Sequence, residues 1–191
     1  TEAVVGHALA EFDRVGGGRD EVLVADLGTG SGAIGLSIAA ERVTARVWCT
    51  DVSRDALAVA RANLTGLGRP ARRVTICEGS WFDGLPADLA GALDLLVSNP
   101  PYVAAGEPLP AEVAGWEPRS ALVPGTDGTE ALEALIDGSV AWLRPGGGLV
   151  LELAPGQASA MVDRALSVGL ATVDVRRDLA GRDRALVARR P

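Results

Sequence analysis

The sequence has no lysine, one histidine and only two cysteines, Cys49 and Cys77. No Cys-x-x-Cys pair occurs, so the ligands for a zinc site built on Cys and His are missing, and we expect no bound metal. No uninterrupted apolar run reaches the roughly 18 residues that a transmembrane helix needs. No signal-peptide pattern stands at the start. We therefore expect a cytoplasmic protein with two buried thiols and no membrane partner.

Positive charge is also scarce, since the formal net charge is −7 and every basic residue is arginine. An acidic surface repels a phosphate backbone, so we expect no direct nucleic-acid partner. Hydrophobic residues make up 48% and charged residues 23% of the 191 residues. This balance is typical of one ordinary globular domain.

Short apolar runs alternate with helical patterns along the whole chain. Seven runs predict strands, at residues 22–26, 46–51, 74–77, 93–97, 149–153, 173–176 and 185–188. Helices are expected at residues 1–15, where the helix would pack on the sheet edge, and at 34–41, 54–66, 129–143 and 157–168. Strands separated by helices indicate an α/β fold with a mostly parallel sheet and helices on both faces. Because no helix separates the last two strands, we expect them to form an antiparallel edge hairpin.

A glycine-rich loop follows the first strand and opens the next helix, with four glycines between Gly28 and Gly35. Such a loop lets the backbone approach a ligand closely. Asp51, at the end of the second strand, can accept both hydroxyls of an adenosine ribose. These features alone leave NAD and S-adenosylmethionine open. Asp26, placed before the loop as a counter-charge for a cationic ligand, favours S-adenosylmethionine, and the Asp-x-Gly-x-Gly-x-Gly spacing resembles motif I of class I methyltransferases.

The sharpest motif is Asn99-Pro100-Pro101-Tyr102, directly after the fourth strand. Two prolines fix two φ angles and remove two N–H donors, which leaves an acceptor-rich clamp suited to a planar amino group. Tyr102 offers a face on which a flat substrate can stack. The motif resembles the (Asn/Asp/Ser)-Pro-Pro-(Tyr/Phe/Trp) motif of methyltransferases that modify planar nitrogens. The long segment that follows, up to Gly128, carries further prolines and is expected to be functional.

The whole chain resembles the release-factor glutamine methyltransferases, the HemK-type family of class I enzymes. The likeness rests on the segments VSNPPYV, WEPRSAL, GTDG, LE with GQ, and DLAGRDR, which begin at residues 97, 116, 125, 151 and 178. The resemblance implies a seven-stranded Rossmann-like fold and methylation of the glutamine amide nitrogen (N5) in the GGQ motif of peptide-chain release factors, with S-adenosylhomocysteine as product.

The resemblance also implies the site residues. The acceptor side comprises the catalytic Asn99, Pro100 and Tyr102, with Pro101 as a further substrate contact. The cofactor side comprises Asp26, Gly28, Thr29, Gly30, Gly32, Asp51, Val52, Ser80, Trp81 and Asn99. Four of the seven aromatic residues are expected at the site rim, namely Trp81, Phe82, Tyr102 and Trp116.

Two departures from the family pattern stand out. Ser80 occupies a place where the family usually has an acid, so Asp83 or backbone would have to replace a carboxylate near the adenine amine. The family's small N-terminal helical domain is also absent from this chain, whose residues 1–191 we interpret as the catalytic domain.

Three alternatives remain from the residues alone. An N6-adenine or N2-guanine nucleic-acid methyltransferase would share the same clamp, but the acidic charge and the lack of a target-recognition domain disfavour it. A nicotinamide-dependent dehydrogenase would have no use for the proline motif. A non-catalytic module that binds an adenosyl ligand is excluded only by an activity assay.

Overall fold

The computed structural model describes residues 2–102 and 128–191, which form one seven-stranded sheet in the order β3-β2-β1-β4-β5-β7-β6. The strands are β1 (Val22–Leu27), β2 (Ala45–Asp51), β3 (Val74–Glu78), β4 (Leu93–Ser98), β5 (Leu143–Glu152), β6 (Ala171–Arg177) and β7 (Asp183–Arg189). All seven predicted strands are therefore present. No helix in this part of the chain is long and apolar enough to cross a membrane.

The pairing directions confirm the expected mixed sheet. Strands β1 to β5 pair with one another in parallel, whereas β7 runs antiparallel to both β5 and β6. The last two strands form the predicted edge hairpin, and β7 inserts between β5 and β6. The predicted α/β class with an antiparallel edge is confirmed.

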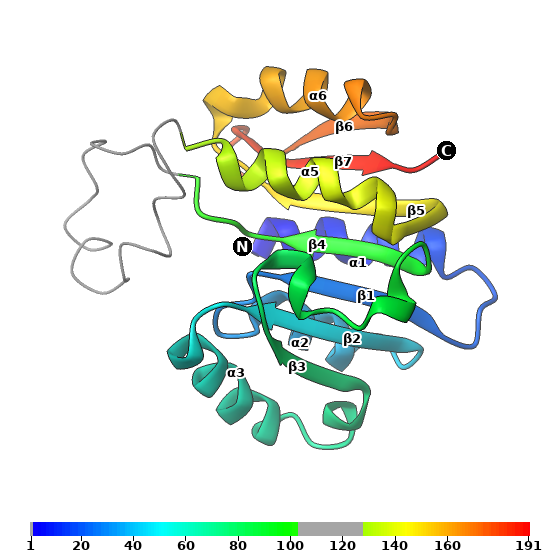
Figure 1. Ribbon diagram of the computed structural model, residues 1–191, viewed down its shortest axis with the longest axis vertical. Coiled ribbons are helices and arrows are strands. Elements are labelled where there is room, and N and C mark those ends of the chain that lie inside the picture. The colour runs from blue at the N-terminus through cyan, green and yellow to red at the C-terminus, as the bar shows by residue number, and fades with distance from the viewer. Residues whose placement is uncertain (1, 103–127) are drawn as a thin grey trace.

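Helices cover both faces of the sheet, also as predicted. They are α1 (Glu2–Val15), α2 (Ala33–Glu41), α3 (Arg54–Gly66), α5 (Glu130–Trp142) and α6 (Ala158–Ser167), with short 3-10 helices η1 (Arg69–Arg73), η2 (Trp81–Gly84), η3 (Ala87–Leu89) and η5 (Pro155–Gln157). Helices α5 and α6 lie on one face, and α1 and α2 lie behind the sheet in Figure 1. The expectation that the first helix packs on the sheet edge was wrong. Helix α1 crosses a face, against β4, β5 and β7, because its apolar residues match the buried side of those strands.

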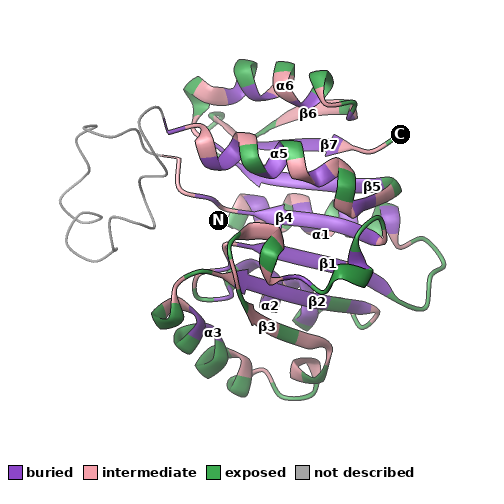
Figure 2. Cartoon of the chain, viewed as in Figure 1, coloured by how far each residue is buried: buried purple, intermediate pink, exposed green. Residues whose placement is uncertain are grey.

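Burial follows strand position (Figure 2). Every residue of the central strand β4 is buried, whereas the edge strands β3 and β6 are mostly intermediate or exposed. This gradient explains why the two thiols differ. Cys49 on β2 is buried, and that burial raises the pKa of its thiol, whereas Cys77 on edge strand β3 is only half-buried, contrary to the expected pair of buried thiols.

Strand β5 begins at Leu143, earlier than the sequence pattern predicts. An Arg-Pro-Gly stretch normally ends a helix, and here Gly146 and Gly147 instead exchange backbone hydrogen bonds with Arg190 at 2.9 and 3.0 Å. Gly146 has a φ of 77°, which glycine adopts readily. The stretch is held to the sheet by these backbone hydrogen bonds to Arg190, which is distant in the sequence, and by the ion pair of Arg144 with the buried Asp94.

Candidate functional site at the carboxyl edge of the sheet

The parallel strands bring the predicted site segments to one edge. Leu27 of β1 is in register with Thr50 of β2, and Asp26 with Val97 of β4. Asp51 is in register with Glu78 of β3. The glycine loop, Asp51, the segment after β3 and the proline motif therefore all start from neighbouring strand ends, where open α/β sheets bind their ligands.

The glycine loop has the conformation that its composition predicts. Gly28, Gly30 and Gly32 have φ values of 67°, 57° and 86°, in the left-handed region that favours glycine. Thr29 is buried, and its backbone N–H donates to the Thr50 carbonyl at 2.9 Å. The loop is thereby fixed to the end of β2, with Gly32 at the start of α2.

Asp51 holds the loop from the other side. Its Oδ2 accepts a hydrogen bond from the Gly30 N–H at 2.9 Å, and its Oδ1 accepts one from the Ser53 N–H at 2.8 Å. Each carboxylate oxygen can accept more than one donor, so Asp51 retains capacity for two ligand hydroxyls. The next residue, Val52, is 64% exposed, and its apolar side chain can serve as a platform for a flat ring. These groups fit an adenosine.

Asp26 is a buried carboxylate beneath the loop, only 1% exposed. Its Oδ2 accepts hydrogen bonds from the Thr29 hydroxyl at 2.6 Å and from the Gly35 N–H at 2.8 Å. Its Oδ1 is buried and has no hydrogen-bond partner among the described residues. Burial raises the pKa of Asp26 to about 6, against the lowering effect of those two hydrogen bonds, and the charge of Asp51 raises it further. A buried acceptor without a donor is unfavourable, so the site fits a cationic ligand near Oδ1.

Asp26 should make the stability of the ligand-free protein depend on pH. Its pKa of about 6 in the folded chain lies above the ordinary value of 3.8, so the folded state binds more protons between these values. The contribution of Asp26 is therefore fully present below pH 3.8 and is lost as pH rises through about 6. The total loss is on the order of 3 kcal/mol.

Denaturant unfolding of the wild type and of Asp26→Asn, from about pH 4 to about pH 8, measures this effect. The difference between the two unfolding free energies should change in favour of Asp26→Asn as pH rises. Other titrating groups are common to both proteins and cancel. A difference that stays constant over this range would contradict the buried, protonatable state of Asp26.

Trp81 lies directly against the glycine loop. A Cβ atom added to Gly28 would lie 2.8 Å from a carbon of the Trp81 indole ring. The Trp81 carbonyl accepts a hydrogen bond from the Thr50 hydroxyl at 3.0 Å, and Trp81 has a φ of 45°, which is unusual for a bulky residue. Such strain is often found at ligand sites. The structure thus brings Trp81 to the loop, with the exposed Ser80 beside it.

Phe82 does not belong to the site rim, contrary to the expectation. Its ring stacks on Trp142 of α5 with a centroid distance of 5.7 Å and an interplanar angle of 17°. Gly138 of the same helix leaves the space that the ring fills. Phe82 therefore packs against the core, and the sequence could not reveal this because its partners lie more than fifty residues away.

The proline motif starts at a firmly held strand end. The buried Ser98 hydroxyl donates to the Leu27 carbonyl at 2.5 Å, which joins the ends of β4 and β1. Asn99 is half-buried and Pro100 is buried, so the motif begins between the glycine loop and the end of β5. Pro101 is half-buried. The Tyr102 hydroxyl lies 3.3 Å from Glu152 Oε1, and burial together with the Glu152 charge raises the pKa of Tyr102.

Gln157 is a residue at this site whose role the sequence did not indicate. Its side-chain N–H₂ donates to the Tyr102 carbonyl at 3.1 Å and to the Gly128 carbonyl at 2.9 Å. Its Oε1 accepts from the Ala154 N–H at 3.0 Å. Gln157 thus joins the end of the proline motif to the segment before α5. The only sequence signal is that it belongs to a family-like stretch after β5.

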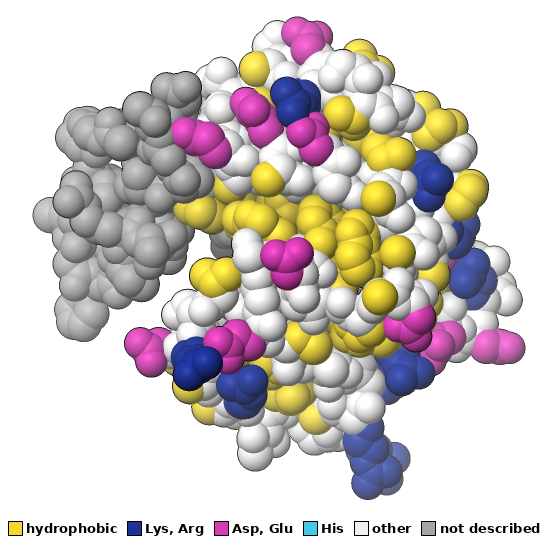
Figure 3. Space-filling view, in the orientation of Figure 1, with side chains coloured by type: hydrophobic (Ala, Val, Ile, Leu, Met, Phe, Trp, Pro, Cys, Tyr) yellow, Lys and Arg dark blue, Asp and Glu magenta, His cyan; other side chains and the backbone are white. Residues whose placement is uncertain are grey.

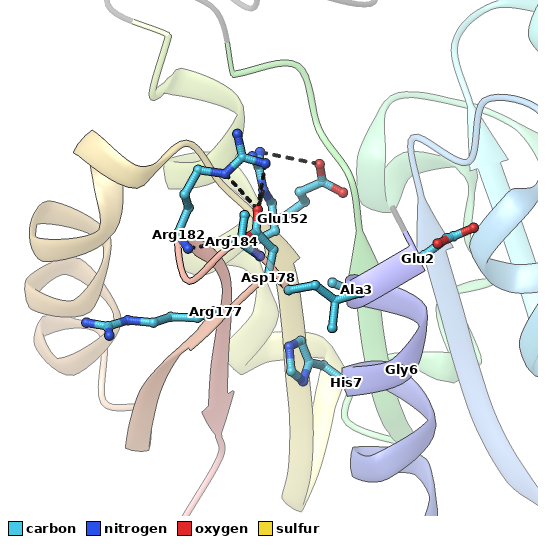
Figure 4. Close-up of a pocket in the computed structure, with 11 residues that line it drawn as sticks. Glu2, Ala3, Gly6, His7, Glu152, Arg177, Asp178, Arg182 and Arg184 are labelled. Carbon is cyan, nitrogen blue, oxygen red and sulfur yellow. Dashed lines mark hydrogen bonds and ion pairs between the residues drawn. The ribbon is translucent and has the colours of Figure 1, made fainter.

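A pocket of about 840 Å³ lies beside Glu152, the residue that the Tyr102 hydroxyl contacts, and was also not expected from the sequence (Figure 4). It is bounded by the first turns of α1, by Glu152 at the end of β5, and by the turn between β6 and β7. The aromatic residue Trp116 and the proline-rich residues 103–127 lie outside the described residues, so their expected place at the rim stays a prediction.

Comparison with known proteins identifies the class. The model of the methyltransferase small domain family matches residues 17–113. The fold resembles the hMettl16 catalytic domain in complex with the MAT2A 3'UTR hairpin 6, with a TM-score of 0.74, 15% identity, and coverage of 97% of this chain and 69% of that one. It also resembles a methyltransferase from Pyrococcus furiosus, with a TM-score of 0.64, 16% identity, and coverage of 98% and 96%. The fold is that of class I methyltransferases, and the chain belongs to the methyltransferase small domain family.

The names of curated relatives point to one particular kind of methyltransferase. The chain is 44% identical, over its full length, to the release factor glutamine methyltransferase of Xylella fastidiosa (strain 9a5c), and covers 66% of that protein. It is 45% identical to the protein of the same name from Moorella thermoacetica, and covers 65% of it. The resemblance to release-factor glutamine methyltransferases is confirmed, and the chain spans slightly less than two thirds of the length of these relatives.

Proposed function

We propose that this chain uses S-adenosylmethionine to methylate the N5 amide nitrogen of the glutamine in the GGQ motif of peptide-chain release factors. The observation that carries the proposal is the position of Asn99 and Pro100 at the end of β4, next to the strand that bears Asp26 and the glycine loop. The names of relatives that are 37–45% identical support the same substrate.

The cofactor side of the proposal rests on three contacts of the loop. Asp51 would accept the ribose hydroxyls, and Val52 and Trp81 would flank the adenine. The buried Oδ1 of Asp26 would accept a hydrogen bond from the cationic amino-acid portion. Ser80, Gly28, Thr29, Gly30 and Gly32 would complete this side through the loop and its neighbouring segment.

The chain's own residues supply orientation rather than a strong base. The Asn99 side-chain carbonyl and the Pro100 carbonyl would accept the two amide hydrogens of the glutamine and aim its nitrogen. When bound, S-adenosylmethionine supplies an electrophilic methyl group. Held by these two acceptors, the glutamine nitrogen would face the methyl carbon. The methyl group would pass to nitrogen while the electron pair of the carbon–sulfur bond stays on sulfur, and one proton would leave the nitrogen to water. Because positive charge grows on nitrogen, these acceptors bind the transition state more strongly than the ground state.

Charge favours a protein acceptor over a nucleic acid. Basic side chains are scattered on the face shown in Figure 3, and hydrophobic side chains gather across its middle. A nucleic-acid methyltransferase needs a basic track for the backbone of the strand whose base it flips. The net charge of −7 agrees with a protein acceptor.

Side-by-side transfer assays test the proposal. Purified chain, labelled S-adenosylmethionine and equal amounts of release factor, DNA or ribosomal RNA should give label in the release factor only. Transfer to DNA or RNA at a rate equal to that for release factor would instead support the N6-adenine or N2-guanine alternative.

Asp51→Ala should weaken cofactor binding by about 1.5 to 3 kcal/mol, because it removes charge-assisted hydrogen bonds to the ribose. Calorimetric titration with S-adenosylhomocysteine measures the change, and NAD should give no signal with the wild type. Asp88→Ala, an exposed acid in η3 before the amino end of β4, is the matched control and should bind normally. Unchanged affinity in Asp51→Ala would remove Asp51 from the cofactor site.

Gln157→Glu should lower kcat by about tenfold and leave cofactor affinity unchanged. A carboxylate cannot donate hydrogen bonds to the Tyr102 and Gly128 carbonyls, and it repels both oxygens. Leaving such a carbonyl without its donor costs about 1–3 kcal/mol of free energy. Steady-state kinetics combined with cofactor titration separate the two effects. A Gln157→Glu enzyme with wild-type kcat would show that the hydrogen bonds of Gln157 do not position the proline motif.

A further inference from the structure

The pocket between α1 and the β6–β7 turn neighbours the proposed acceptor site through one shared residue, Glu152. Glu152, at the carboxyl end of β5, is only 4% exposed and lines the pocket. The same carboxylate lies 3.3 Å from the Tyr102 hydroxyl. A polypeptide whose glutamine enters between Asn99 and Tyr102 would therefore have this pocket next to it.

The charges in the pocket balance one another. Three acids and three arginines line it, and two of the acids lie close to two of the arginines. Arg182 contacts Asp178 at 2.9 Å, and Arg184 lies 3.8 Å from Asp178 and 3.9 Å from Glu152 (Figure 4). Burial, with the nearby charge of Arg176, lowers the pKa of His7, which disfavours a positive charge on this ring. Such a lining suits an uncharged main chain with N–H and C=O groups better than a row of phosphates.

A hydrogen-bonded turn holds an apolar side chain at the rim of this pocket. The Asp178 Oδ1 accepts hydrogen bonds from the N–H groups of Ala180 and Arg182 at 2.9 and 3.0 Å. The Asp178 N–H donates to the Arg182 carbonyl at 2.8 Å, which closes the turn. Leu179, between these bonds, has a relative exposure of 105%. This turn therefore presents an apolar side chain to water at the rim of a pocket that shares Glu152 with the proposed acceptor site.

We propose that this pocket seats the main chain that flanks the acceptor glutamine of the protein substrate, with Leu179 as its apolar anchor. The inference rests on the proposed function and assigns the surface on which the substrate polypeptide docks. The occupant is an uncharged segment containing glycine, because glycine lets the main chain approach the paired charges closely. The pocket thereby contributes to recognition of the protein and does not take part in methyl transfer.

Leu179→Asp tests the inference without affecting the core, because Leu179 is fully exposed. Initial rates with intact release factor should give a KM at least about tenfold above that of the wild type, with kcat changed less than about twofold. Leu179→Met should restore a KM close to that of the wild type, since it keeps an apolar side chain of similar size. Val43→Asp is the matched control. Val43 is 82% exposed and lies before β2, at the opposite edge of the sheet, so its KM should not change.

The outcomes separate this inference from the proposed function. A Leu179→Asp enzyme whose KM equals that of Val43→Asp overturns the docking site, while methylation of release factor by the wild type would still support the proposed function. If the wild type transfers no methyl group to release factor, both are overturned. A rise in KM for Leu179→Asp that Leu179→Met does not restore would also contradict an apolar anchor.

Discussion

Replacing Asn99 with alanine should lower kcat for release factor about 10²- to 10³-fold, the usual cost of losing one preorganised group that stabilises a transition state. The proposed role of Asn99 is to accept an amide hydrogen and aim the nitrogen, and this interaction strengthens as positive charge develops. Cofactor affinity should change much less than kcat, because the loop residues Asp26 and Asp51 would carry most of that binding. Steady-state kinetics and calorimetric titration give the two numbers.

Asn99→Asp is the informative companion variant. Aspartate keeps acceptor oxygens at nearly the same place, so this enzyme should retain more activity than Asn99→Ala. If Asn99→Ala turns over at a rate near that of the wild type, the proline motif is not the acceptor site. In that case the observation that carries the proposed function is lost.

A release factor whose GGQ glutamine is replaced by glutamate should receive no methyl group. A carboxylate has no N–H for the two acceptors and no nitrogen to methylate, so the loss should be complete rather than partial. The two factors differ in one side chain, so the comparison isolates the acceptor atom. Label in the glutamate variant at the rate of the normal factor would mean that a different residue is modified.

Much of the fold follows from local patterns. The near-continuous apolar runs at β1 and β4 predicted buried parallel strands, and both are almost fully buried. The positive φ values of Gly28, Gly30 and Gly32 explain why the loop needs those glycines. The sequence placed Asp26, Asp51 and Asn99 at or just after the ends of predicted parallel strands, and such strand ends lie along one edge of the sheet.

The features that the sequence did not predict depend on distant partners. Gln157 bonds to Tyr102 and Gly128, and Phe82 stacks on Trp142, although nothing local distinguishes either residue. The early start of β5 at Leu143 likewise depends on hydrogen bonds to Arg190 near the end of the chain. The pocket beside Glu152 forms only when α1 and the β6–β7 turn meet.

Peptide mass spectrometry of release factor incubated with this chain and S-adenosylmethionine tests the central claim most directly. The account predicts a single added methyl group, located by fragmentation on the side-chain amide of the GGQ glutamine and absent when Asn99→Ala replaces the wild type for the same short incubation. An unmodified GGQ peptide, or a methyl group on another residue, would contradict it.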